Sequence, residues 1–102
     1  MIQLPHKAAL EAKMKIKSGF ILEEVGGAYL AVAIGERAEE MRVLIKLNST
    51  GAFLWNIMAE GEVTEEALVD KMIENYGIDA SLAKKDVETF VTKLREGGLL
   101  DE

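Results

Sequence analysis

The spacing of apolar residues changes near residue 48, and this change limits the fold more than any other feature of the sequence. Between residues 19 and 47 the pattern has a period near two, which is the period of a β-strand. After residue 48 they recur at every third or fourth position, which is the period of an amphipathic helix. The sequence therefore predicts an α+β domain in which the strands come first and the helices follow.

Three strands are predicted before residue 48, at residues 19–25, 28–34 and 42–47. Gly26 and Gly27 separate the first two, and glycine adopts at little cost the positive φ angles that a two-residue hairpin turn requires. Residues 35–40 are predicted to form a polar loop. The expected product is a three-stranded antiparallel meander. Its third strand turns three residues to the core, Val43, Ile45 and Leu47, and three to the open face, Arg42, Leu44 and Lys46.

Three helices are predicted after residue 48. Asn48 can cap the first, because its side-chain oxygen accepts one of the unpaired backbone N–H groups, and Gly61 is expected to end it. Thr64 caps the second helix, which Gly77 stops, and the third follows Asp79 and runs to about residue 96.

The expected core combines the inner stripes of these helices. In the first helix we expect Trp55 at the rim of a stripe made of Phe53, Leu54, Ile57 and Met58. The third helix turns inward Ala83, Val87, Phe90, Val91 and Leu94. After two glycines that break this helix, Leu99 and Leu100 are expected to return to the core.

Composition limits the compartment. The 102 residues are expected to form one domain at residues 14–102, preceded by a mobile N-terminal extension at residues 1–13. Cysteine is absent from the sequence, so disulfides and thiolate chemistry are excluded. No apolar stretch is long enough for a signal peptide or a membrane span, so we expect a cytoplasmic protein with no membrane partner.

Groups suited to catalysis are few in this sequence. His6 is the only histidine, and it belongs to the N-terminal extension. Adjacent glutamates occur at residues 23–24, 39–40 and 65–66, but neighbouring side chains point apart on a strand or a helix, so they do not form a metal site. We therefore expect a protein with no catalytic residues, no metal and no cofactor.

A DNA-binding winged-helix-like regulator is the main alternative, because residues 64–96 have the helix, turn and helix outline of a helix-turn-helix motif. The distribution of charge along the sequence disfavours DNA binding. Residues 1–47 carry seven Lys and Arg against six Asp and Glu, whereas residues 48–102 carry five against twelve, a balance of −7. Phosphate contacts require clustered cations, so no nucleic-acid partner is expected.

Peptide binding by strand addition is a third possibility, because the edge strands of a meander leave backbone N–H and C=O groups unpaired. Residues 42–47 form the candidate edge, and residues 19–25 form the other edge. The same edge could pair with a second copy of the chain, so a homodimer or a self-associating scaffold is a further alternative.

Three stretches of the sequence, taken together, resemble the PqqD family of small proteins from pyrroloquinoline quinone biosynthesis. They are MKIKSGFILEEVGGAYLAVAIG, VLIKLNSTGAFLW and DVETFVTKLREGGLL, and the resemblance covers residues 14–102. The pair LNxTGxxLW and DVxxFxxxLxxxGLL is its specific part. The resemblance implies three strands packed on a winged-helix-like unit of three helices. It also implies a non-catalytic peptide chaperone, a recognition element of ribosomal peptide modification. Such a protein binds a precursor's leader peptide and presents it to a radical SAM enzyme.

Carried onto this sequence, the resemblance places the leader beside residues 42–47, in a cleft with the helix at residues 82–93. The LNSTG segment then belongs to the scaffold and turns the chain from the strand into the core helix. One flank of the third helix carries Leu82, Asp86 and Lys93, with Phe90 at its border, and the other carries Lys84, Glu88 and Arg95. Leu82 is apolar yet outside the inner stripe, which favours the first flank. The predicted peptide-binding residues are Arg42, Val43, Leu44, Ile45, Lys46, Leu47, Leu82, Asp86, Phe90 and Lys93.

Overall fold

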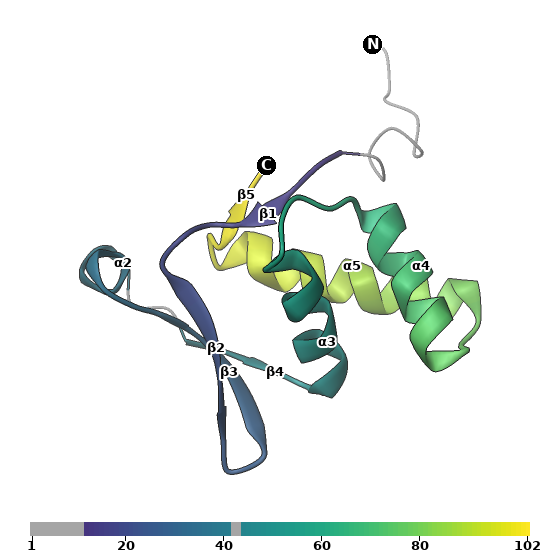
Figure 1. Ribbon diagram of the computed structural model, residues 1–102, viewed down its shortest axis with the longest axis horizontal. Coiled ribbons are helices and arrows are strands. Elements are labelled where there is room, and N and C mark those ends of the chain that lie inside the picture. The colour runs from purple at the N-terminus through teal and green to yellow at the C-terminus, as the bar shows by residue number, and fades with distance from the viewer. Residues whose placement is uncertain (1–11, 42–43) are drawn as a thin grey trace.

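The computed structural model describes residues 12–41 and 44–102 of the chain (Figure 1). The predicted N-terminal extension therefore lies outside the described residues as far as residue 11. The hairpin of the larger sheet and the three long helices occupy different sides of the molecule, as Figure 1 shows. The predicted α+β class is confirmed, because the three strands of the larger sheet come before residue 48 and the three long helices after it.

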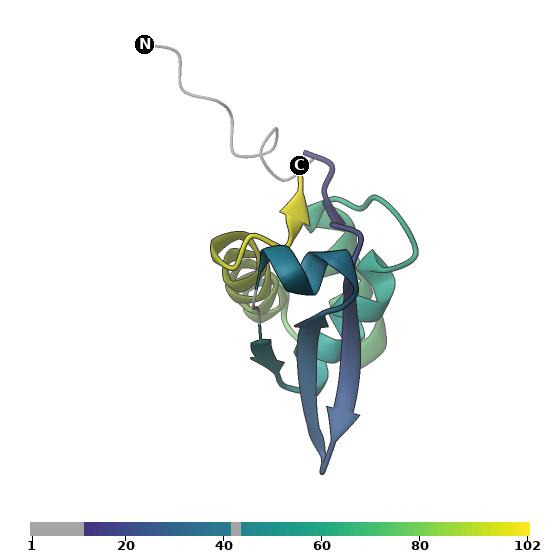
Figure 2. The same cartoon turned by 90° about the vertical axis from the view of Figure 1, so that its left-hand side faces the viewer.

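Three antiparallel strands form the larger sheet, in the order β2-β3-β4. They are β2 (Phe20–Val25), β3 (Ala28–Ala33) and β4 (Leu44–Leu47). The predicted hairpin turn is confirmed, because Gly26 and Gly27 have φ angles of 56° and 81°. Figures 1 and 2 show this hairpin extending well beyond the helices. The predicted first two residues of the third strand, Arg42 and Val43, lie outside the described residues.

A second sheet, which the sequence did not predict, joins the two ends of the described chain. It pairs β1 (Lys15–Ile16) with β5 (Leu100–Asp101) in antiparallel register. The Lys17 N–H also donates to the Leu99 carbonyl at 2.8 Å. Leu99 and Leu100 are 0% and 8% exposed, so their predicted return to the core is confirmed.

The three predicted helices are present, as α3 (Ser49–Met58), α4 (Glu65–Tyr76) and α5 (Ala80–Glu96). The cap at Asn48 is confirmed, because its side chain accepts the Gly51 N–H at 2.7 Å. Thr64 caps α4 in the same way, with an Ala67 N–H donor at 3.1 Å. The prediction that Gly61 ends the first helix was wrong. The last helical residue is Met58, because the chain then turns so that Val63 can pair with Met14.

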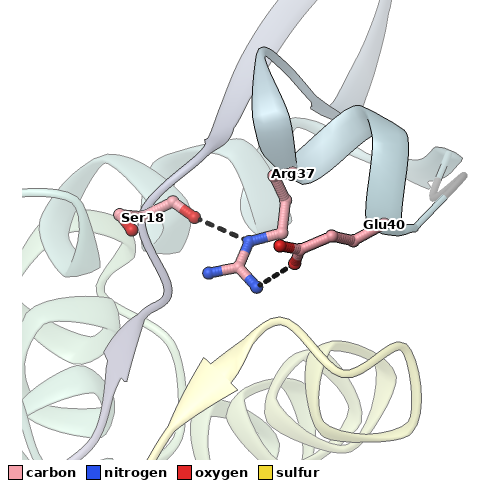
Figure 3. A network of polar contacts seen from close by, with 3 residues as sticks. All are labelled: Ser18, Arg37 and Glu40. Carbon is pink, nitrogen blue, oxygen red and sulfur yellow. Dashed lines mark hydrogen bonds and ion pairs between the residues drawn. The ribbon is translucent and has the colours of Figure 1, made fainter.

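The prediction of a polar loop at residues 35–40 was also wrong, because a short helix, α2 (Glu36–Glu40), forms there. Its anchor is the Arg37 side chain, which Figure 3 shows between Ser18 and Glu40. Arg37 Nε donates to the Ser18 carbonyl at 3.0 Å, and Nη1 lies 3.4 Å from Glu40 Oε2. The guanidinium also lies 5.6 Å from the centre of the Phe20 ring. These contacts come from tertiary structure, which local sequence does not reveal.

The core lies between the inner face of the sheet and the helices. Most of its large side chains are those predicted, but Trp55 is only 3% exposed instead of lying at a rim. Trp55 borders a surface hollow together with Ile16 of β1 and Phe20 of β2. The predicted inner residue Phe53 is half-buried and packs edge-on against Tyr76, with ring centroids 5.3 Å apart. No helix within the described residues is long and apolar enough to cross a membrane.

Candidate functional site

The hydrogen bonds of β3 determine which backbone groups of β4 are unpaired. In an antiparallel sheet, the N–H and C=O of one residue point to one neighbouring strand, and those of the next residue point to the other. The Ile34 N–H, just after β3, donates to the Gly19 carbonyl at 2.8 Å, so residue 34 faces the β2 side. Ala31, three positions earlier, therefore faces β4, where its partner in the register is Ile45.

The backbone of Leu44 and Lys46 consequently points away from β3, to the open edge of the sheet. The backbone groups of Ile45 and Leu47 point to β3. Leu44 and Lys46 alternate with them along β4, so their backbone groups point the other way. Each of these two residues presents one N–H donor and one C=O acceptor at this edge. The Leu44 side chain is 68% exposed, as expected for a residue turned to the open face. β4 thus ends the sheet with a row of polar groups that another strand could use.

Helix α5 lies beside this edge and makes one polar contact with it. Lys93 Nζ donates to the Lys46 carbonyl at 3.3 Å. This distance is longer than the usual range for an N–H···O bond, and the contact is exposed to solvent. The bond supports the assignment of the edge, because the Lys46 carbonyl must point away from β3 to reach Lys93.

A cavity of about 110 Å³ lies between β4, the start of α3 and α5. Its apolar lining includes Leu47 and Phe90, which are 4% and 5% exposed. Its charged lining consists of half-buried Asp86 and exposed Lys93, both from α5. Four of the ten predicted peptide-binding residues therefore surround one cavity. The complete lining is Leu47, Asn48, Thr50, Gly51, Leu54, Asp86, Thr89, Phe90 and Lys93.

Sequence reasoning did not predict that the LNSTG segment lines this cavity, because it assigned the segment to the scaffold. The LNSTG segment is part of the scaffold and also lines the cavity. Asn48 caps α3, and Gly51 allows close contact, since a Cβ atom at Gly51 would lie 3.1 Å from the Cβ of Leu47. Asn48 and Thr50 also border the cavity. Their position in the sequence could have indicated this role, because residues that directly follow an edge strand lie at the end of any groove beside that strand.

Leu82 does not line the cavity, although it was predicted on the same flank as Asp86 and Lys93. Its side chain is 48% exposed. The four residues of β4 extend for about 13 Å, which corresponds to about nine residues of helix. Gly97 lies against Ile45, because a Cβ atom there would be 2.7 Å from Ile45 Cδ1. Counting nine residues back from Gly97 ends well short of Leu82, so the strand does not reach that far along α5.

The opposite flank of α5 is occupied in part by an ion pair. Arg95 Nη2 lies 2.7 Å from Glu102 Oε1, and Arg95 Nε donates to the other carboxylate oxygen at 3.1 Å. The hydrogen bond from Arg95 lowers the pKa of Glu102, and the same bond raises the pKa of Arg95. Arg95 is thereby engaged at the C-terminal end of the chain, on the side of α5 away from the cavity.

The described residues bring no three His, Cys, Asp or Glu side chains together in a way that could hold a metal ion. His6 lies outside these residues. Within residues 12–41 and 44–102, the features of the site are therefore an unpaired strand edge and a small charged cavity.

Two solved structures share this fold. One, described as "TbiB1 in Complex with the TbiA(beta) Leader Peptide", has 20% sequence identity and a TM-score of 0.65, over 85% of this chain and 94% of that chain. The other, "Lasso peptide synthetase B1 complexed with the leader peptide", has 15% identity and a TM-score of 0.66, over 89% of this chain and 100% of that chain. A search of the curated proteins finds no match to this sequence.

A family comparison places most of the sequence in one group. Residues 20–100 match the family described as Coenzyme PQQ synthesis protein D (PqqD). This match covers more than half of the 102 residues and includes β4, the start of α3 and all of α5, which together border the cavity. The resemblance noted in the sequence is confirmed, and the chain belongs to the PqqD family.

Proposed function

We propose that this protein is a non-catalytic adaptor that binds the leader segment of a precursor peptide by adding it as a strand beside β4. It then presents the bound peptide to a modifying enzyme of the radical SAM class. The observation that carries the proposal is the backbone of Leu44 and Lys46, which points away from β3 next to the cavity between β4 and α5. Membership of the PqqD family supports it, as do the two structures of the same fold that hold leader peptides.

An added strand would divide its side chains between two environments. A peptide residue directly opposite Lys46 places its side chain on the same face as Lys46, which is the open face of the sheet. The residues before and after it point to the other face, where the cavity lies. Peptide side chains at alternate positions would therefore contact Leu47 and Phe90, or the charged groups of Asp86 and Lys93.

Backbone bonds alone cannot account for a stable complex. Leu44 and Lys46 offer two donors and two acceptors, and four hydrogen bonds at about 1 kcal/mol net each amount to about 4 kcal/mol. A micromolar dissociation constant corresponds to about 8 kcal/mol. Side chains that enter the cavity must supply the difference, so the cavity determines which peptides bind.

DNA binding has less support. The net charge is −6, and the cations of α5 are interspersed with Asp86, Glu88 and Glu96. Neutralising phosphates requires several cations on one face, and this helix does not provide them.

Backbone amide shifts of the isotopically labelled protein test the proposal. A synthetic peptide with the leader sequence of a candidate precursor is titrated, with a scrambled peptide of the same composition as the control. We expect the largest shifts at Leu44, Lys46 and the residues that line the cavity, with β2 unchanged. Shifts confined to β2, with β4 silent, would contradict the proposal. The adaptor role is tested separately, by whether the radical SAM enzyme modifies the precursor faster when this protein is added.

A further inference from the structure

The cavity beside β4 carries charges of opposite sign at its two ends. Helix α5 and strand β4 run in opposite directions, because Ile45 lies against Gly97 while the next residue, Lys46, lies against Lys93. Asp86 therefore stands further along the groove, past the end of β4, where the start of α3 borders the same cavity. The groove is therefore cationic at the end near the beginning of β4 and anionic at the end near the beginning of α3.

Within the part of the chain that the structure describes, neither of these charges takes part in a salt bridge. Of the described residues, none forms a hydrogen bond or ion pair with the Asp86 carboxylate. The Gly51 N–H at the start of α3 is bonded to Asn48 instead. Among residues 12–41 and 44–102, Lys93 donates only to the Lys46 carbonyl, and it forms no ion pair with Glu96, one turn further along α5. Both charges are consequently available to a ligand in the groove.

Lys93 also holds the acceptor that an added strand would require. A backbone N–H of the peptide would replace the ammonium group at the Lys46 carbonyl, because an N–H of an added strand can approach along the strand-pairing direction at about 2.9 Å. The displaced ammonium would then lie beside the peptide without a partner. A peptide carboxylate on the groove side would restore an ionic interaction for Lys93, and a peptide cation there would be repelled by Lys93.

We infer that the groove selects peptides by the order of their charges. The inference rests on the proposed function, and it names the class of peptide: an extended segment with a basic residue first and an acidic residue later. The order follows from direction. Every described strand pair in the larger sheet is antiparallel, and in this proposal the added strand continues that pattern, antiparallel to β4. Its N-terminal part then lies near Asp86 and its C-terminal part near Lys93.

The spacing of the two charges follows from α5. Asp86 and Lys93 are seven residues apart, which is about 10 Å along a helix. An extended peptide advances about 3.4 Å per residue, so this length corresponds to about three residues. Side chains that point into the groove come from every second residue. The basic and acidic residues are therefore two or four positions apart.

A display selection tests the inference without a known ligand. Random peptides of about twelve residues, which reach about 40 Å when extended, are selected on the wild-type protein and on the Asp86→Lys, Lys93→Glu double variant. We expect wild-type binders enriched in Lys or Arg followed, two or four positions later, by Asp or Glu. The double variant should select the opposite order. A synthetic wild-type binder should lose about tenfold in affinity when its two charged residues are exchanged, and regain it on the double variant.

The control is Lys84→Glu, which makes the same charge change as Lys93→Glu about two and a half helical turns earlier, on the other flank of α5. This variant should select the same order as the wild type. Binders with no charge order, or with the reverse order on the wild type, would overturn the inference and leave strand addition standing. A failure to select any binder would count against the proposed function itself.

Discussion

Replacing Phe90 with alanine should lower the free energy of unfolding by about 3 kcal/mol. The Phe90 side chain is 5% exposed and belongs to the core cluster of α5. Truncating a buried phenylalanine typically costs about 3–5 kcal/mol, and the cost rises with the volume of the void that is left. Here the void would open into the cavity of about 110 Å³ that Phe90 already lines. Water could enter it, so we expect the lower end of the range.

Urea denaturation followed by circular dichroism measures this loss. A domain of this size is typically stable by about 5–15 kcal/mol, so the variant should remain folded in buffer. Its melting temperature should fall by about 10–20 °C. Phe90→Leu is the matched control and should cost about 1.5 kcal/mol or less, because it keeps most of the apolar volume. An unchanged unfolding midpoint for Phe90→Ala, together with lost peptide binding, would refute the assignment of Phe90 to the core.

Three further changes have outcomes that the structure predicts. Asn48→Ala should lower the free energy of unfolding by about 1 kcal/mol in urea denaturation, whereas Asp79→Ala should cost less, because the Asp79 side chain forms no capping bond. Glu102 has a lowered pKa in the folded protein, so its ion pair with Arg95 stabilises the fold at neutral pH. That contribution is fully present above the ordinary pKa of a glutamate and is lost as the pH falls through the lowered pKa of folded Glu102. Because both partners are largely exposed, the loss should be a few tenths of a kcal/mol, and Glu102→Gln should remove it from a plot of stability against pH. Leu44→Glu should change the stability by about 0.5 kcal/mol or less, yet weaken peptide binding in a fluorescence titration. Equal binding by this variant would exclude the Leu44 side chain from the interface.

Periodicity and turn chemistry were sufficient to predict the main elements of this fold. Residues 19–34 contain two β-type runs on either side of Gly26 and Gly27, and the hairpin follows from local preferences alone. Helix α2 and the sheet of β1 with β5 could not be predicted in this way. α2 depends on the contact between Arg37 and Ser18, 19 positions apart, and strands of two residues show no period.

The flank of α5 that borders the candidate site could be predicted from the sequence, but the length of α5 that the site covers could not. A rotation of 100° per residue places Asp86 and Lys93 on one side of α5, and the cavity includes both. The same arithmetic placed Leu82 there, but it says nothing about where β4 ends along the helix. The bond between Lys93 and the Lys46 carbonyl joins residues 47 positions apart, so it is visible only in the folded chain.

The most direct test of strand addition at β4 is a scan of the leader peptide with single N-methyl groups. Methylation removes one backbone donor at a time and leaves the side chains unchanged. In an antiparallel pair, only every second amide of the added strand points to β4. Affinity should therefore fall with a period of two along the segment that pairs with Leu44 and Lys46, and methylation at the intervening positions should have little effect. A loss that is uniform along the peptide, or that repeats every three or four residues as in a bound helix, would contradict strand addition.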